Sequence, residues 1–170
     1  AANREKVYDE GYVHQNFLLM KDFSDQNRTI VASIWDIPDR MVQNPDATVG
    51  RLVKEDMYEE LADSIAQFVK YAKDMYGIHI QYLSFNESEG GINVLLNGEQ
   101  YARIIKLTAE KLENLGFGNI KWLAGDTSNA STLLPFVQYQ LQDEECRPYI
   151  GAISYHSWDV NGISTEILEN

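Results

Sequence analysis

Apolar residues gather in four short runs along the chain, separated by longer segments with helical periodicity. The runs are TIVASIW at 29–35, IHIQYLSF at 78–85, NIKWLAG at 119–125 and YIGAISYHSW at 149–158. Each run is rich in β-branched or aromatic residues and is continuous rather than strictly alternating. That pattern is typical of parallel strands covered on both faces. We therefore predict four buried strands.

The segments between the runs predict amphipathic helices. In 54–76 the apolar side chains recur with a period near 3.6 residues, and Gly77 follows where a left-handed C-terminal cap would lie. Asn97 and Gln100 have the spacing of an N-terminal capping box for the next helix, which Gly116 would end. The predicted buried face of the first of these helices comprises Tyr58, Leu61, Ile65, Phe68, Val69, Ala72 and Met75.

Two further helices are predicted, at about 131–142 and within 13–23. The buried face of the former is predicted to comprise Leu134, Val137, Gln138 and Leu141. Helices and strands thus alternate strictly along the chain, which favours a parallel sheet built from right-handed βαβ units. We find no linker, repeat or low-complexity stretch, and we predict a single α/β domain over residues 1–170.

The charge balance and the cysteine content narrow the classes of partner. The net charge is −12, with 26 acidic and 14 basic residues, and no run of Lys or Arg forms a basic stripe. Nucleic acids and anionic membranes are therefore not expected partners. Cys146 is the only cysteine and the three histidines are far apart in the sequence, so we expect no intrachain disulfide, metal site or cofactor.

Polar and aromatic residues follow each predicted strand, at the end where parallel α/β folds bind their ligands. These residues are Trp35, Asp36, Asn86, Glu87, Glu89, Asp126, Tyr155, His156, Trp158 and Asp159. Carboxylates beside aromatic rings, without a glycine-rich phosphate loop, suit a neutral polyhydroxylated ligand such as a sugar. The indole faces of Trp35 and Trp158 would then cover the C–H surface of the sugar ring.

Structural roles remain open for several of these residues. Asp36, Asp126 and Asp159 would serve equally well as helix N-caps. His156 could be a hydrogen-bonded core histidine or a site residue, and Glu89 could bind substrate or remain solvated.

The pair Asn86-Glu87 at a strand end resembles the acid/base motif of clan A glycoside hydrolases, (β/α)8 barrels in which Asn-Glu closes the fourth strand. Ser88 stands where proline usually follows. The segment VASIWDIPDRM at 31–41 is similar to the third-strand segment of family 30, while AGDTS at 124–128 and AISYHSW at 152–158 resemble fifth- and sixth-strand segments. The resemblance implies that residues 1–170 are part of a TIM-barrel catalytic domain, incomplete as given, holding about strands three to six.

On this resemblance the protein is a retaining β-glycoside hydrolase acting on a polysaccharide or oligosaccharide. Glu87 would be the general acid/base, and Asn86 would hydrogen-bond the sugar 2-hydroxyl. The other residues implied in substrate binding are Trp35, Asp36, Glu89, Asp126, Tyr155, His156 and Trp158. The nucleophile would close a seventh strand outside this segment. Glu166 is left unassigned, because Ser164 and the residues after it look like the start of a helix.

Three further expectations concern the alternative function, self-association and localisation. The alternative function is a non-catalytic carbohydrate-binding module or degenerate barrel fragment, in keeping with the missing nucleophile. Four parallel strands would leave two open sheet edges, through which two copies could pair. Secretion or cell-surface attachment is expected by resemblance to polysaccharide-degrading enzymes.

Overall fold

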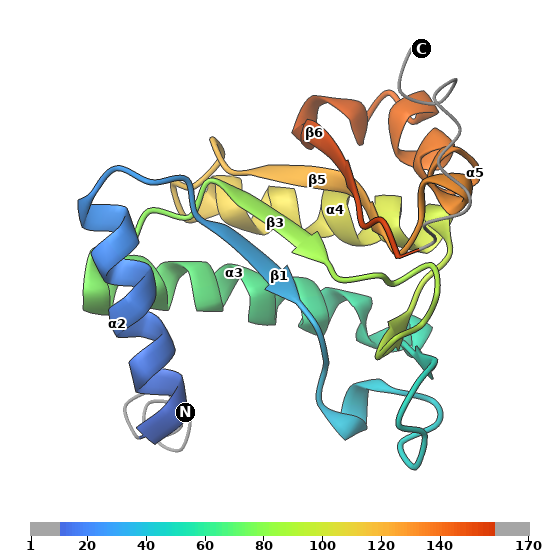
Figure 1. Cartoon of the computed structure of the whole chain (residues 1–170), viewed down its shortest axis with the longest axis horizontal. Coiled ribbons are helices and arrows are strands. Elements are labelled where there is room, and N and C mark those ends of the chain that lie inside the picture. The colour runs from blue at the N-terminus through green and yellow to red at the C-terminus, as the bar shows by residue number, and fades with distance from the viewer. Residues whose placement is uncertain (1–10, 159–170) are drawn as a thin grey trace.

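A computed structural model describes residues 11–158, so Asp159 and the helix start expected at Ser164 lie outside the described residues. Four parallel strands form one sheet in the order β1-β3-β5-β6, and α3 and α4 lie together on one side of it (Figure 1). The strands are β1 (Val31–Ile34), β3 (Tyr82–Phe85), β5 (Lys121–Thr127) and β6 (Ile150–Tyr155). The prediction of a parallel α/β fold is confirmed.

One helix precedes β1 and three connect the strands of this sheet, and all four begin and end close to the predicted residues. They are α2 (Gly11–Asp25), α3 (Tyr58–Tyr76), α4 (Gly98–Asn114) and α5 (Ala130–Gln142). Asn97 and Gln100 form the predicted capping box at the start of α4, each side chain bonding the other residue's backbone amide. Gly77 ends α3 with a left-handed φ of 71°. None of the helices within 11–158 combines the length and apolar character that a bilayer crossing requires.

Several short elements were not predicted. A second, two-stranded parallel sheet pairs β2 (Arg51–Leu52) with β4 (Val94–Leu95). Short 3-10 helices are η1 (Asp39–Met41), η2 (Glu55–Met57) and η3 (Arg147–Tyr149). Elements of two or three residues are too short to leave a periodic signal in the sequence.

The strand predicted at 78–85 begins only at Tyr82. Ile78 and Ile80 are buried in the connection between α3 and β3 without belonging to the ladder. A run of apolar residues indicates that a segment is buried, and here the buried segment extends beyond the residues that form the hydrogen-bonded ladder.

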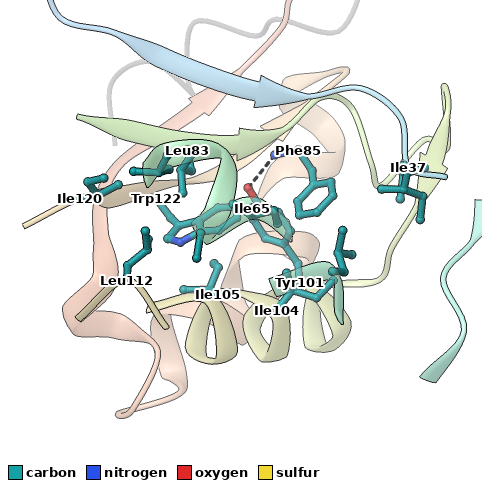
Figure 2. Packing of buried hydrophobic residues seen from close by; sticks show 14 of the residues in the cluster. Ile37, Ile65, Leu83, Phe85, Tyr101, Ile104, Ile105, Leu112, Ile120 and Trp122 are labelled. Atoms are coloured by element: carbon teal, nitrogen blue, oxygen red, sulfur yellow. Dashed lines mark hydrogen bonds between the residues drawn. The ribbon is translucent and has the colours of Figure 1, made fainter. Parts of the chain in front are cut away.

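An aromatic cluster fills the space between the sheet and α4. Figure 2 shows the Tyr101 side chain, from α4, reaching toward Phe85 and Trp122 on the strands. Its hydroxyl accepts a hydrogen bond from the Phe85 amide at 3.2 Å and donates one to the Leu123 carbonyl at 3.0 Å. Trp122 is fully buried. This cluster packs α4 against β3 and β5, the strands that lead to Glu87 and Asp126.

The buried face of α5 differs from the predicted one. Leu134 is 72% exposed, whereas Phe136, Val137 and Gln140 are buried. The amide of Gln140 donates a hydrogen bond of 2.8 Å to the carbonyl of Gly98. A Cβ at Gly98 would lie 2.4 Å from the Phe136 carbonyl oxygen, so a glycine there allows α5 to approach α4 closely. This contact, rather than the apolar periodicity of α5, sets which side of the helix is buried.

The prediction that all strands are covered on both faces is wrong for β1 and β6. Within the described part of the chain each of these strands has a neighbour on one side only. Val31 is 46% exposed and Ile153 is 51% exposed, so the described residues leave part of a face of each strand uncovered. Met75, predicted to be on the buried face of α3, is 59% exposed at the end of that helix. Pairing of two copies through the open edges stays a prediction.

Cys146 gives a direct chemical test of the packing around the loop that follows α5. Burial raises the pKa of its thiol from 9.0 to about 12, and the nearby Asp143 carboxylate acts in the same direction. Because thiolates are the reactive form, we expect iodoacetamide at pH 8 to alkylate the folded protein at least about a hundredfold more slowly than the urea-unfolded protein. Because the folded state favours the neutral thiol, the contribution of Cys146 to the stability of the fold is complete below pH 9.0. It declines as the pH rises from there towards about 12. Equal alkylation rates in the two states would contradict the buried position.

Candidate active site

Glu87 lies two residues beyond the end of β3, at the carboxyl edge of the sheet. Its side chain is buried with the residue only 5% exposed, and its backbone is left-handed with a φ of 45°. The Glu87 amide donates to the Asp126 carbonyl at 2.9 Å, and the Asn86 amide donates to the Ile34 carbonyl at 3.0 Å. The turn is therefore fixed to both neighbouring strands. A non-glycine residue held in this conformation costs about 1–3 kcal/mol, and such strain concentrates at functional sites.

The Glu87 carboxylate meets two side chains from the segment that follows β6. The Trp158 indole N–H donates to Glu87 Oε1, and His156 Nδ1 lies 3.4 Å from the same oxygen. The imidazole and indole rings stack with their centroids 5.9 Å apart and their planes 8° apart. The His156 amide donates to the Thr127 carbonyl at 2.6 Å, which holds this segment against the end of β5. Three of the residues predicted from the sequence are thus brought together.

A bulge at the end of β5 aims Asp126 towards these residues. The register between β5 and β6 shifts between Gly125 and Thr127, and Asp126 has a left-handed φ of 51°. Gly125 has a φ of 88°, and a Cβ there would lie 2.7 Å from the Ser154 carbonyl oxygen. Bulges of this kind re-aim a side chain next to a site. Asn129, not Asp126, occupies the N-cap position of α5, so the alternative role of Asp126 as a helix cap is not what the structure shows.

Both carboxylate oxygens of Asp126 lie near hydrogen-bond donors. Ser84 and Ser33 donate to Oδ2 at 2.7 and 3.3 Å. Ser154 donates to Oδ1 at 3.4 Å, and His156 Nε2 lies 3.4 Å from that oxygen. His156 therefore lies between two carboxylates, with one ring nitrogen facing each. None of the three serines was predicted as a site residue, and Ser33 and Ser154 were noted only within the third- and sixth-strand segments. Their only signal in the sequence is a small polar residue within otherwise apolar strands.

Glu89 lies on the same loop but faces the start of α5. Its Oε1 accepts hydrogen bonds from the Ser128 amide at 2.7 Å, the Ser128 hydroxyl at 2.5 Å and the Thr132 hydroxyl at 2.9 Å. Oε1 of Glu89 is therefore neither solvated nor free to bind a substrate. Thr132 was not predicted as a site residue, and Ser128 was noted only within the fifth-strand segment.

Three other predicted site residues have no contact with Glu87 among those described. Trp35 is 57% exposed and lines a groove of about 750 Å³ between β1 and α3. Asp36 forms an ion pair with the buried guanidinium of Arg51. Tyr155 is half-buried at the end of β6, opposite Thr127 in the register. Substrate binding by these three residues stays a prediction.

Comparisons with known proteins give solved structures of the same fold. No family model and no curated protein matches the chain. An endo-β1,6-glucanase superposes with a TM-score of 0.76 at 17% identity over 94% of this chain and 38% of its own. A glycoside hydrolase family 30 subfamily 8 xylanase from Clostridium acetobutylicum gives a TM-score of 0.71 at 20% identity, over 85% of this chain and 37% of the xylanase. A family 30 endoxylanase from Clostridium papyrosolvens C71 gives a TM-score of 0.70 at 20% identity, over 90% of this chain and 38% of the endoxylanase.

These likenesses establish the fold. The chain spans less than two fifths of each of these proteins, and the described strands do not close a barrel. Residues 11–158 are a consecutive series of β/α units with the TIM-barrel architecture of family 30 glycoside hydrolases.

Proposed function

We propose that residues 1–170 are part of the catalytic barrel of a retaining β-glycoside hydrolase, with Glu87 as the general acid/base. The observation that carries this proposal is the buried Glu87 carboxylate on a strained turn at the carboxyl edge of the sheet, in contact with Trp158 and His156. Ligands of parallel α/β folds bind at this edge. The fold likeness to xylanases and an endo-β1,6-glucanase adds support.

In the first step of the proposed reaction, Glu87 donates its proton to the glycosidic oxygen while the bond from that oxygen to the anomeric carbon breaks. A second carboxylate, about 5–5.5 Å from Glu87 in a retaining enzyme, forms the covalent bond to the anomeric carbon. We place this nucleophile on a seventh strand outside residues 1–170, as the resemblance of Asn86-Glu87 to the clan A motif implies.

In the second step Glu87, now ionised, accepts a proton from water as the water oxygen bonds to the anomeric carbon and the enzyme carboxylate leaves. The Trp158 N–H, which donates to Glu87 Oε1, would hold the carboxylate in one orientation. His156 would keep the Glu87 carboxylate in place in both steps.

The test is hydrolysis by the protein that carries this chain, followed by proton NMR of the first sugar released. Xylan, β-1,6-glucan and aryl β-glycosides are the substrates to assay, since the first two correspond to the activities named for the structural neighbours. We expect the β-anomer to appear first and the α-anomer only later by mutarotation.

Other outcomes would overturn the proposal in distinct ways. Release of the α-anomer first would mean inversion of configuration. Saturable binding of these glycans without turnover would favour the carbohydrate-binding module. The absence of both binding and turnover would count against both functions.

A further inference from the structure

Glu89 links the loop that carries Glu87 to the segment that carries Ser128. One oxygen of Glu89 accepts three hydrogen bonds from Ser128 and Thr132, at 2.5 to 2.9 Å. Its other oxygen, Oε2, is buried and has no hydrogen-bond partner among residues 11–158. Through these hydrogen bonds Glu89 joins the loop after β3 to the segment that begins α5.

The segment held by Glu89 also holds the residues in contact with Glu87. The Ser128 carbonyl faces the Trp158 amide at 3.5 Å, and the adjacent Thr127 carbonyl accepts from the His156 amide at 2.6 Å. The side chains of Trp158 and His156 in turn contact Glu87 Oε1. A short path of hydrogen bonds and backbone therefore runs from Glu89 to the carboxylate of Glu87.

We propose that Glu89 is a positioning residue for Glu87, in place of the substrate-binding role expected from the sequence. Its carboxylate fixes Ser128 and the adjacent Thr127, and the carbonyls of these two residues position Trp158 and His156 against Glu87. The inference rests on the proposed function, because it assigns Glu89 a role in placing the proton that Glu87 donates.

The experiment compares two substrates in the protein that carries this chain. Departure of a poor leaving group, such as a sugar hydroxyl, needs the proton of Glu87, whereas 2,4-dinitrophenolate departs without it. Displacement of a catalytic group by about 1 Å can cost on the order of 10²-fold. We expect Glu89→Gln to lower kcat/KM by about 10- to 100-fold for an unactivated β-glycoside and by less than about twofold for the dinitrophenyl β-glycoside.

Two variants on the other side of the contact provide independent measurements. Thr132→Val and Ser128→Ala each remove one hydroxyl donor to Glu89 and should shift the ratio of the two rates in the same direction, by smaller factors. They also keep the inference testable if Glu89→Gln does not fold. Glu99→Gln, at an exposed glutamate in the first turn of α4, is the matched control and should leave both rates unchanged.

The outcomes separate this inference from the proposed function. Equal losses on both substrates would mean that Glu89 acts through folding or substrate binding, and would overturn the inference. If Glu87→Gln shows the leaving-group signature and the Glu89, Ser128 and Thr132 variants do not, only the inference fails. If Glu87→Gln hydrolyses the unactivated substrate at the parent rate, the proposed function itself fails.

Discussion

Glu87→Gln is expected to lower kcat/KM for an unactivated β-glycoside by about 10²- to 10⁴-fold, the usual contribution of general acid–base catalysis. Glutamine has nearly the same shape and its amide oxygen can still accept from the Trp158 N–H, but it cannot donate or accept the catalytic proton. The measurement is steady-state hydrolysis by the protein that carries this chain, with folding checked by circular dichroism. Glu99→Gln removes an exposed acid in the same way and should retain the parent rate.

A chemical rescue sharpens this prediction. In Glu87→Ala the carboxylate is absent, so water must attack the glycosyl-enzyme without a base. Azide needs no base and can attack the anomeric carbon instead of water. On the dinitrophenyl β-glycoside we expect azide to raise the turnover of Glu87→Ala and to give a β-glycosyl azide. An unchanged rate in Glu87→Gln, or no azide adduct in Glu87→Ala, would count against the acid/base role.

Trp122→Ala is expected to destabilise the protein by about 3–5 kcal/mol, the range for truncating a buried aromatic residue. The indole is fully buried, with ring centroids 6.0 Å from Phe85 and 5.9 Å from Tyr101. Its loss would leave a cavity between α4 and the strands that lead to Glu87 and Asp126 (Figure 2). Urea denaturation monitored by circular dichroism measures the change in the free energy of unfolding.

Trp122→Phe is the matched comparison. Phenylalanine keeps most of the ring contacts and removes an indole N–H that is buried without a hydrogen-bond partner among the described residues. Removing an unsatisfied donor offsets part of the lost packing, so we expect a much smaller destabilisation than for alanine. Equal effects of the two substitutions would mean that the cluster around Trp122 does not depend on ring packing.

Features decided by neighbouring residues were predictable from the sequence. The capping box of Asn97 and Gln100 involves residues within one helical turn, and Gly77 adopts its left-handed backbone without help from distant contacts. The alternation of helices and strands follows from local periodicity, and it is sufficient to indicate a parallel sheet. The placement of Glu87 at the carboxyl edge of that sheet then follows from chain direction alone.

The contacts of the candidate site were less accessible, because they join residues far apart in the chain. Trp158 and Glu87 are 71 residues apart, and Ser128 and Glu89 are 39 apart. The sequence predicted Glu87, His156 and Trp158 at strand ends but did not reveal that the last two contact the first. For Glu89 it left two roles open, substrate binding and solvation, and the structure shows neither at Oε1.

The sequence by itself determined the α/β class, the order of its elements and the edge of the sheet at which the acidic residues gather, since these depend on periodicity and chain direction. Only the tertiary structure decided which carboxylates meet His156, which face of α5 is buried and what Glu89 holds. Those features depend on close approaches between separate elements, such as α5 on Gly98 and the bulge that aims Asp126. Such approaches are set by the shapes of both partners, and one segment's pattern of apolar residues does not encode its partner's shape.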